Sequence, residues 1–349
     1  MPTSPIQVGL IGYGFAGRTF HAPVIRAVPG LHLSAVVQRH GDDAQKALPG
    51  VEVLRSADDL LRQDSIRLVV IATSNTSHFE LAKQCLLAGR DVIIDKPFAT
   101  TLSQAEELAR IAAQQKRMLS VFQNRRWDGD FLTVRQLLEA GTLGRIVLFE
   151  THFDRYRPQL RAGAWREAAL PGSGVLLDLG PHLVDQALSL FGLPQAVGAD
   201  IRIERDHAVI DDAFDLILYY PRMRACLRAS MLAAHAGPRF LIHGSEASYL
   251  KHGLDPQEAL LREGKVPTNS SWGEESPEAW GTIYRAENHA VPEERVPTLP
   301  GDYRRYYENV RDALLGKADV IVTPQQALHV MRVLDLAQRS SQERRVLPW

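Results

Sequence analysis

The sequence predicts an α/β protein of two domains, in which a doubly wound parallel sheet precedes an α+β domain with an open, mostly antiparallel sheet. Up to residue 124, short β-rich apolar runs alternate with longer segments of helical periodicity, which is typical of parallel strands joined by crossover helices. Beyond residue 125, turns separate most of the apolar runs, and strands joined in this way pair antiparallel. The length of 349 residues also favours two domains, which we place at residues 1–124 and 125–349, with terminal helices that can pack back onto the first.

In the first domain, two helices are predicted at residues 78–88 and 103–115. Ser103 stands three residues before Glu106, which is the spacing of a capping box, and Gly89 follows the first helix where a C-cap favours positive φ. The strands of this domain are predicted at residues 6–11, 33–37, 67–72, 92–94 and 118–122.

The second domain is predicted to begin with a helix around residues 131–140, followed by strands at 145–153, 214–220, 224–232 and 239–243. Residues 254–300 are rich in Pro, Gly, Glu and Ser and show little periodicity, so we expect a long irregular excursion there. Two helices, at residues 303–315 and 324–339, are predicted near the C-terminus.

The composition argues against several classes of protein. Hydrophobic residues make up 45% and charged residues 23%, which is ordinary for a soluble globular chain and argues against disorder or a coiled coil. The 40 basic and 41 acidic side chains balance, and no basic block is dense enough for nucleic acid. Cys85 and Cys226 are too far apart to indicate a disulfide framework or a thiolate metal site. Because no targeting or membrane segment is visible, we expect a cytoplasmic protein without a nucleic-acid or membrane partner.

A glycine-rich loop follows the first predicted strand directly, and a helical segment follows the loop. Its three glycines have the G-x-G-x-x-G spacing of a dinucleotide-binding turn, in which the first allows the turn and the third allows close helix packing. The second leaves room for a diphosphate, which the helix N-terminus favours. A structural turn is the alternative, and no H-R-D or D-F-G segment supports a kinase. The sequence therefore predicts a Rossmann domain whose cofactor site includes Gly12, Gly14, Phe15, Ala16 and Gly17.

The end of the second predicted strand bears on the choice between NADP and NAD. The acidic residue that would bind the ribose 2′-hydroxyl of NAD is missing, and the strand ends in Gln38 and Arg39. Gln38 does not repel a 2′-phosphate, and the Arg39 guanidinium can bind it or stack on adenine. The sequence thus favours NADP, with NAD possible because Asp42 and Asp43 stand nearby, and with a merely solvated Arg39 as the alternative.

Asp95, Lys96 and Pro97 follow the fourth predicted strand, and ligands of open α/β sheets bind at the carboxyl ends of strands. Most lysines are surface residues, but here a buried strand precedes Lys96 and a proline follows it. Burial and an adjacent positive nicotinamide would lower the pKa of such a lysine toward a catalytically useful range. Lys96 is therefore a candidate catalytic residue.

A second group of candidates lies at the start of an apolar helix. Asp178 and His182 are four residues apart, so on a helix both side chains face the same way and the carboxylate can orient the imidazole. Pro181 is tolerated only near a helix start, so we expect the helix to begin between Val175 and Asp178. A capping role for Asp178 is the structural alternative.

No metal site is predicted. A site built from Asp178, His182 and Asp185 lacks an H-E-x-x-H motif or a third imidazole. His21, after the glycine loop, is predicted to be a packing residue, and His78 is predicted to lie beside a helix cap.

With Gly12-x-Gly14-x-x-Gly17, Asp95-Lys96-Pro97 and Asp178-x-x-x-His182 in this order, the sequence resembles the Gfo/Idh/MocA oxidoreductase family over nearly its whole length. Residues 124–128, 165–167, 172–187 and 253–258 resemble those of a bacterial subgroup without assigned substrates. The resemblance implies a Rossmann domain, a C-terminal α/β substrate and oligomerisation domain, and a nicotinamide cofactor at their cleft. It also implies a homodimer or homotetramer assembled through the C-terminal sheet.

The resemblance extends to the cofactor site. Asp95 stands where the family usually has Glu, and is implied to set the position of Lys96. Thr73 and Asn75 resemble a loop that contacts the nicotinamide ribose. Trp165 and Arg166 correspond to a Trp-Arg pair that approaches the cofactor, with a structural aromatic anchor as the alternative.

The activity that the resemblance implies is hydride transfer between nicotinamide and a hydroxyl-bearing carbon of a sugar, polyol or related compound. His182 would take the hydroxyl proton, Lys96 would stabilise the developing alkoxide, and Asp178 would position them. Besides His182, substrate contacts are expected from Asn124, Asp154 and Arg157. The alternatives are a non-sugar diol or conjugated double bond as substrate, and a dinucleotide-binding sensor without turnover.

Overall fold

The structure is a computed structural model that describes residues 4–161, 163, 167–268, 271–285 and 292–349. The chain folds into two units. The first contains residues 1–124, 257–272 and 302–328, and the second contains residues 125–256, 273–301 and 329–349. Residues 257–272, which the sequence assigned to the second domain, thus belong to the first unit, and so do residues 302–328, where a terminal helix was expected to pack back onto the first domain.

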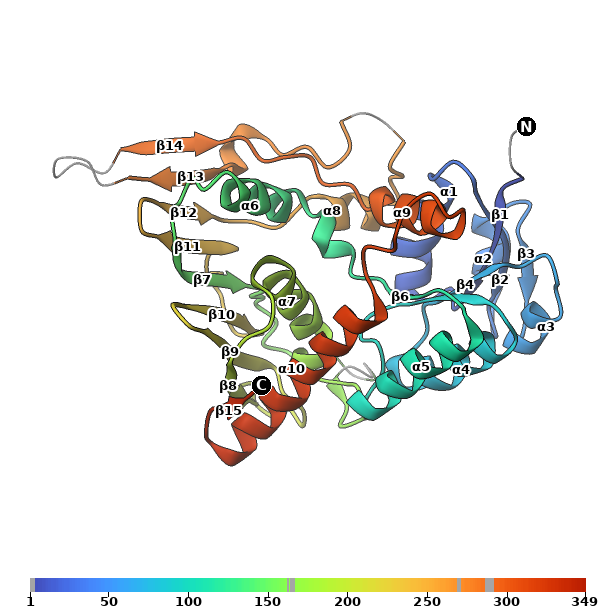
Figure 1. The fold of residues 1–349 in the computed structure, drawn as a ribbon. Coiled ribbons are helices and arrows are strands. Elements are labelled where there is room, and N and C mark those ends of the chain that lie inside the picture. Colours follow the sequence, from blue (N-terminus) through green and yellow to red (C-terminus); the bar gives the residue numbers. More distant parts are fainter. Residues whose placement is uncertain (1–3, 162, 164–166, 269–270, 286–291) are drawn as a thin grey trace. The chain divides into compact units, whose positions relative to one another are not determined.

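The first unit is built on a parallel sheet of six strands in the order β3-β2-β1-β4-β5-β6 (Figure 1). All four residues of β4 and of β5 are buried, as expected where helices cover both faces of a parallel sheet. The strands are β1 (Ile6–Ile11), β2 (Leu31–Val37), β3 (Glu52–Leu54), β4 (Leu68–Ile71), β5 (Asp91–Ile94) and β6 (Leu119–Val121). The five predicted strands are confirmed within two residues, and β3 was missed.

Most helices of the first unit connect these strands, whereas α8 and α9 come from later in the chain and pack against η1 and α1 (Figure 1). Thr101, not Ser103, caps α5, because its side chain accepts a hydrogen bond from the Gln104 N–H at 3.2 Å, so the predicted capping box is wrong. Gly89 has the predicted positive φ, 74°. The helices are η1 (Gly17–His21, a π-helical turn), α1 (Ala22–Arg26), α2 (Asp43–Ala47), α3 (Ala57–Leu61), η2 (Asn75–Ser77), α4 (His78–Leu87), α5 (Leu102–Gln115), α8 (Gln257–Arg262) and α9 (Arg304–Leu314).

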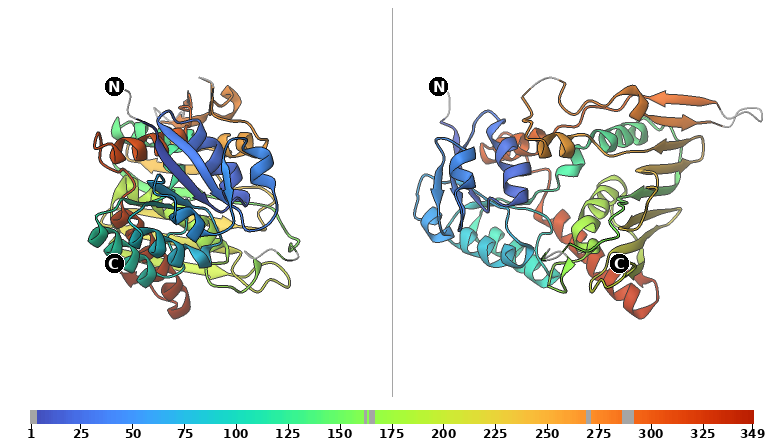
Figure 2. Two further views of the ribbon diagram at one scale, coloured as in Figure 1. Left: turned by 90° about the vertical axis from the view of Figure 1, so that its right-hand side faces the viewer. Right: turned by 180° about the vertical axis from the view of Figure 1, so that it is seen from behind.

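The second unit contains a sheet of nine strands in the order β14-β13-β12-β11-β7-β10-β9-β8-β15 (Figure 2). All neighbours pair antiparallel except β7 and β10, which are parallel, so the sheet is mixed but mostly antiparallel. The strands are β7 (Ile146–His152), β8 (Ala196–Arg202), β9 (Ala213–Tyr220), β10 (Met223–Ser230), β11 (Phe240–Gly244), β12 (Ser248–Lys251), β13 (Gly281–Tyr284), β14 (Glu293–Val296) and β15 (Leu347–Pro348).

Helix α7 (Val175–Phe191) packs on one face of this sheet, where Phe149 of β7 meets Phe191 with ring centroids 5.2 Å apart. We call the opposite face the outer face. Helices η3 (Asn124–Trp127), α6 (Gly129–Glu139), η5 (Pro277–Ala279) and α10 (Pro324–Glu343) are the other helical elements of this part of the chain. The prediction of an irregular segment at 254–300 is wrong, since it contains α8, β13 and β14. Among the helices that the structure describes, none has both the length and the apolar character that crossing a membrane requires.

Candidate functional site

The three glycines of the loop after β1 have different surroundings. A Cβ on Gly12, whose φ is 103°, would lie 2.6 Å from the Ala72 carbonyl oxygen, and one on Gly17 would lie 2.0 Å from the Gly12 carbonyl oxygen. Around Gly14, by contrast, no atom of the described chain lies within 4 Å of the corresponding position. The fold itself therefore requires glycine at 12 and 17, whereas Gly14 leaves open space at the end of β1. A diphosphate fits such a space.

Phe15 and Ala16 lie between this open space and η1. Ala16 is the N-cap of η1, and Phe15 is 40% exposed, with its ring edge-on to Phe20 at 5.7 Å. The guanidinium of Arg262, at the end of α8, lies 5.0 Å from the Phe15 ring centroid. Gln257 anchors the start of α8, because its side-chain oxygen accepts hydrogen bonds from Trp272 Nε1 at 3.0 Å and from the Tyr303 N–H at 2.8 Å. Sequence reasoning missed Arg262, because residues 254–300 carry no periodic signal.

The end of β2 presents arginine to solvent. Arg39 is exposed, whereas the Gln38 side chain is buried and donates to Asp43 Oδ2 at 3.1 Å while accepting from the Ala44 N–H at 2.8 Å. Asp42 pairs with the Lys46 ammonium at 2.9 Å. Both acids that could have favoured NAD thus have partners of their own.

A second guanidinium lies in the same loop. Arg55, just after β3, donates to the Gln38 carbonyl at 2.9 Å and to the Gly41 carbonyl at 2.7 Å. These two hydrogen bonds hold the loop that carries Arg39 in place. Because β3 itself was missed, Arg55 could not be placed there from the sequence.

The loop after β4 and the loop after β5 are joined by His78. Thr73 accepts a hydrogen bond from Ser77 Oγ at 2.7 Å, and Asn75 is buried in η2. His78 Nδ1 lies 2.9 Å from the Pro97 carbonyl oxygen, and Nε2 lies 3.3 Å from that of Thr73. Burial lowers the pKa of His78 despite the opposing effect of Asp95, so the ring is held neutral. His78 begins α4 as predicted, but it also links two loops that carry candidate site residues.

Lys96 lies directly after β5, at the same edge of the parallel sheet as the glycine loop. Its side chain is partly exposed, and its N–H donates to Asp95 Oδ1 at 2.9 Å. The Lys96–Pro97 peptide bond is cis. Asn124, at the start of η3, is buried. The first unit therefore brings the glycine loop, the Thr73–Asn75 loop and Lys96 to one sheet edge.

In the second unit, the start of α7 is capped by a residue that sequence reasoning did not name. Asp211 Oδ2 accepts a hydrogen bond from the Leu176 N–H at 2.7 Å, while the Asp178 N–H donates to the Gly174 carbonyl at 3.1 Å. A Cβ on Gly174, whose φ is 88°, would lie 2.0 Å from Asp211. The alternative that Asp178 caps the helix is therefore wrong, and the helix begins at Val175, within the predicted range from Val175 to Asp178.

Asp178 and His182 lie one turn apart on α7. His182 is buried, with 6% of its surface exposed, and its ring meets Phe153 edge-on at 6.3 Å. Arg155 Nη1 lies 4.0 Å from Asp178 Oδ2. Arg155, Arg157 and Asp178 line one small cavity of about 20 Å³. The second unit thus places the predicted residue Arg157 close to Asp178, with Arg155 as an unpredicted neighbour.

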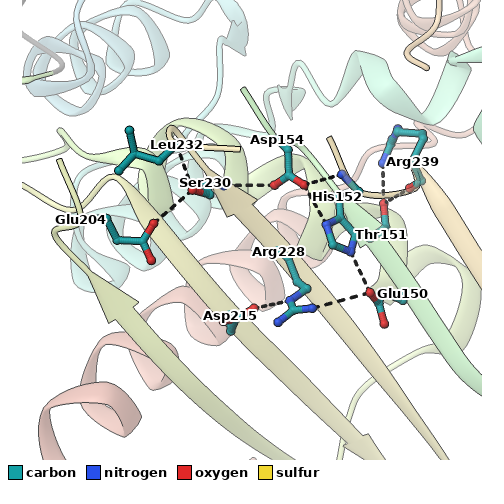
Figure 3. Close-up of polar contacts among 11 residues, drawn as sticks. Glu150, Thr151, His152, Asp154, Glu204, Asp215, Arg228, Ser230, Leu232 and Arg239 are labelled. Carbon is teal, nitrogen blue, oxygen red and sulfur yellow. Dashed lines mark hydrogen bonds and ion pairs between the residues drawn. The ribbon is translucent and has the colours of Figure 1, made fainter. Parts of the chain in front are cut away.

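Asp154 lies elsewhere, with side chains of the outer face (Figure 3). Its Oδ1 accepts from the Ser230 N–H at 3.2 Å, and its Oδ2 accepts from the Gly237 N–H at 2.9 Å and contacts His152 Nδ1 at 3.0 Å. His152 Nε2 also contacts Glu150 at 2.8 Å. Burial alone would lower the pKa of His152, but its bonds to Asp154 and Glu150 raise it. His152, Asp154 and Ser230 line a cavity of about 210 Å³ together with Asp200, Arg202, Glu204, Asp215 and Arg228. The geometry assigns Asp154 to this face and not to a substrate site with Asp178 and His182.

Two predicted cofactor residues, Trp165 and Arg166, lie outside the described residues. Within the described part of the chain, no group of three or more His, Cys, Asp and Glu side chains is arranged to hold a metal ion.

Comparison with known proteins matches both units to one family. A family model described as "Oxidoreductase family, NAD-binding Rossmann fold" matches residues 6–123, and its companion, "Oxidoreductase family, C-terminal alpha/beta domain", matches residues 135–348. The chain belongs to the Gfo/Idh/MocA oxidoreductase family. The predicted family and fold class are therefore confirmed.

Individual relatives cover almost the whole chain. The oxidoreductase YdgJ of Escherichia coli (strain K12) is 45% identical over 98% of both chains. The enzyme named scyllo-inositol 2-dehydrogenase (NADP(+)) IolW, from Bacillus subtilis (strain 168), is 34% identical over 98% of this chain and 95% of its own. Among solved structures, the oxidoreductase YvaA from Bacillus subtilis has a TM-score of 0.96 at 34% identity, covering 100% of this chain and 99% of that one.

Proposed function

We propose that this family member is an NADP-dependent oxidoreductase that acts on a hydroxyl-bearing carbon of a sugar, polyol or related compound. The observation that carries the proposal is the sheet edge of the first unit, where Lys96 follows β5 and the open space at Gly14 follows β1. A lysine at the carboxyl end of a strand beside a dinucleotide loop is suited to stabilise a developing negative charge on oxygen. The name of IolW, a dehydrogenase of a cyclic polyol that uses NADP, supports both the substrate class and the cofactor.

The cofactor would be held by side chains and backbone of the first unit. Gly14, Phe15 and Ala16 would hold the diphosphate, with Arg39 at the 2′-phosphate and Thr73 and Asn75 at the nicotinamide ribose, while Gln38 shapes the loop. When bound, the nicotinamide ring supplies or accepts the hydride.

Three side chains carry the proposed proton and charge chemistry. Lys96 donates a hydrogen bond to the substrate oxygen and stabilises negative charge on it, and His182 takes or returns the hydroxyl proton. Asp178, one turn before His182, orients the imidazole or a neighbouring hydroxyl. Asn124 and Arg157 remain proposed substrate contacts, and Arg155 joins them because it lies beside Asp178.

The decisive experiment is a fluorescence titration of the purified protein with NADPH and NADH, followed by nicotinamide absorbance over a panel of inositols, sugars, open-chain polyols and non-sugar diols, with conjugated ketones tested for reduction. Binding with turnover of a polyol or sugar would support the proposal. Turnover of only the diols or ketones would favour the alternative substrate class. Tight binding without turnover across the panel would favour a sensor, and no binding would contradict the cofactor assignment.

Arg39→Ala is expected to raise the Kd of NADPH by about 10–100-fold and to leave that of NADH within about twofold, because only NADPH carries the 2′-phosphate. Fluorescence titration of both cofactors measures the ratio. Arg110→Ala is the matched control, since Arg110 lies exposed on α5 and bonds only locally, to Gln114 at 3.0 Å. An unchanged NADPH to NADH ratio in Arg39→Ala would refute the role of Arg39.

Arg262→Ala is expected to weaken NADPH and NADH equally, by about three- to fivefold, which is the scale of an exposed ion pair. The guanidinium over Phe15 adjoins the proposed diphosphate position, which the two cofactors share. Arg262→Lys keeps the charge and should lose less affinity. Titration at two salt concentrations measures both effects, and equal affinities of wild type and Arg262→Ala would remove Arg262 from the site.

We also propose that the protein assembles as a homodimer or homotetramer through the outer face of the C-terminal sheet. Leu148, Ile217, Leu241 and Leu250 of β7, β9, β11 and β12 are only half-buried, while the residues that directly follow them, Phe149, Leu218, Ile242 and Lys251, are buried. Such a half-covered apolar face is suited to a self-complementary interface. Sedimentation velocity should show an oligomer for wild type and for Leu87→Arg, an exposed control on α4. Ile217→Arg should sediment as a monomer, and an unshifted oligomer would contradict this face.

A further inference from the structure

A buried series of polar groups in the first unit leads from α9 to the Lys96 loop. Tyr307 Oη lies 2.6 Å from His21 Nδ1, and His21 Nε2 lies 3.8 Å from Asp95 Oδ1. The same Asp95 oxygen accepts the Lys96 N–H at 2.9 Å. Tyr307 and His21 have no exposed surface. We call Tyr307, His21 and Asp95 the relay, and its members come from α9, η1 and the end of β5.

The two ring nitrogens of His21 have different partners. Burial raises the pKa of Tyr307 well above its ordinary value, so the phenol keeps a proton that it can share with His21 Nδ1. His21 Nε2 is the ring nitrogen that faces Asp95. At 3.8 Å this last contact is electrostatic and longer than a hydrogen bond.

Asp95 is held as a carboxylate. Burial alone would raise its pKa, but His21, Lys96 and His78 together lower it below its ordinary value. Tyr307, on α9, is in turn affected by Asp95 and by its neighbour Tyr306, so the titratable groups that act on Asp95 and on the relay come from η1, the β5 end, α4 and α9. A fixed negative charge therefore stands beside Lys96.

The His21 ring is also held mechanically. It packs on Phe122 with centroids 4.3 Å apart and meets the Tyr307 ring edge-on at 6.2 Å. Phe122 in turn contacts the rings of Tyr306 and Tyr307. Close packing on these sides fixes the plane of the imidazole, and the contact with Tyr307 Oη selects the ring flip in which Nδ1 faces the phenol and Nε2 faces the carboxylate. The prediction that His21 is a packing residue was therefore incomplete.

We propose that His21 and Tyr307 are positioning residues, which act through Asp95 to hold the Lys96 loop so that its amine reaches the reacting oxygen. The inference rests on the catalytic role of Lys96 in the proposed function. Misplacement of a catalytic group by about 1 Å lowers turnover by as much as about 100-fold, so loss of the hold on Asp95 should be visible in kcat. Neither residue is a catalytic residue, because neither is placed at the reacting atoms.

The chain offers a matched pair of variants for the test. Tyr307→Phe removes the hydroxyl that is hydrogen-bonded to His21 Nδ1, whereas Tyr306→Phe removes the neighbouring buried hydroxyl, which donates to Ser120 Oγ at 2.9 Å. Both lose one buried hydrogen bond on α9, so both should lower the midpoint of thermal unfolding by similar amounts. Only Tyr307→Phe should lower kcat, by about tenfold, with the Kd of NADPH unchanged. His21→Gln should lower kcat further.

A second readout needs no substrate. The rate at which an acylating reagent labels the Lys96 amine can be followed against pH by peptide mass spectrometry. In Tyr307→Phe, the Lys96 amine should be labelled faster than in wild type at every pH, because a loop that is held less firmly exposes its side chain more. In Tyr306→Phe the profile should coincide with that of wild type.

The two readouts separate failure of this inference from failure of the proposed function. If wild type turns over nothing in the substrate panel, the labelling profiles still decide whether the relay acts on Lys96. The inference is overturned if Tyr307→Phe and Tyr306→Phe have equal kcat values and superimposable labelling profiles. If His21→Gln does not fold, the tyrosine pair alone decides.

Discussion

Lys96→Ala is expected to lower kcat by about 10²–10³-fold while leaving the Kd of NADPH within about twofold of wild type. The size of the loss follows from the removal of the charged donor that Lys96 would direct at the substrate oxygen. Cofactor affinity is expected to survive, because the glycine loop, the β2 end and the loop after β4 supply the cofactor contacts. Single-turnover absorbance with the substrate found in the panel measures the chemical step, and fluorescence titration measures the Kd.

Two further variants test the catalytic assignment of Lys96: Lys96→Arg conserves the charge, and Lys83→Ala is the control. Arginine keeps the charge but changes the donor geometry, so it should restore only part of the lost rate. Lys83 lies on α4 and pairs with Glu107 at 2.8 Å, so its replacement should change neither kcat nor Kd. If Lys96→Ala lost turnover and cofactor affinity in equal proportion, Lys96 would be a cofactor-binding residue and its catalytic assignment would be wrong.

The parts of the fold that were predictable are those in which one segment contains the whole signal. Strand β4 is four consecutive buried aliphatic residues, and the turn at Gly12, Gly14 and Gly17 follows from steric demands within a few residues. Strands β3 and β14 carry no such signal. Glu293, Glu294 and Arg295 of β14 are exposed at a sheet edge, so pairing with β13 and not side-chain periodicity makes them a strand.

The same distinction between local and long-range signals applies to the candidate site. Lys96, Asp178 and His182 are recognisable from local spacing, but their supporting groups come from distant segments. Tyr307 is 286 residues from His21, and Asp211 is 35 residues from the helix end that it caps. Such contacts depend on tertiary packing, which a single sequence does not reveal.

Asp154 shows the limit of local reasoning in another way. A polar residue at a strand end was expected to face a substrate, but strand alternation decides which side it faces. Phe153 meets the ring of His182, whereas His152 and Asp154 bond to each other in the cavity of the outer face (Figure 3). Two consecutive residues of this segment thus face opposite sides of the sheet, Phe153 toward His182 and Asp154 toward the outer face.

Gly14→Ala and Gly14→Val should abolish tight binding of NADPH and NADH, raising Kd by about 100-fold or more, without weakening the fold. That rise corresponds to about 2.7 kcal/mol of binding free energy. The reason is that a Cβ at position 14 meets open space in the protein, so it would collide only with a bound diphosphate. Unlike Gly12, Gly14 does not have a positive φ, so an L-residue is accommodated there, and alanine restricts the unfolded chain. The thermal midpoint without cofactor should stay within about 2 °C of wild type.

Gly17→Ala provides the contrast that makes the Gly14 result interpretable. Its Cβ would lie 2.0 Å from the backbone oxygen of Gly12, so the damage must fall on the fold itself and appear as a lower thermal midpoint without any cofactor. A second contrast comes from adding NADPH, which should raise the midpoint of wild type by mass action but not that of Gly14→Val. Wild-type affinity in Gly14→Val would mean that the open space after β1 is not where a dinucleotide binds, and the glycine loop would then be a structural turn.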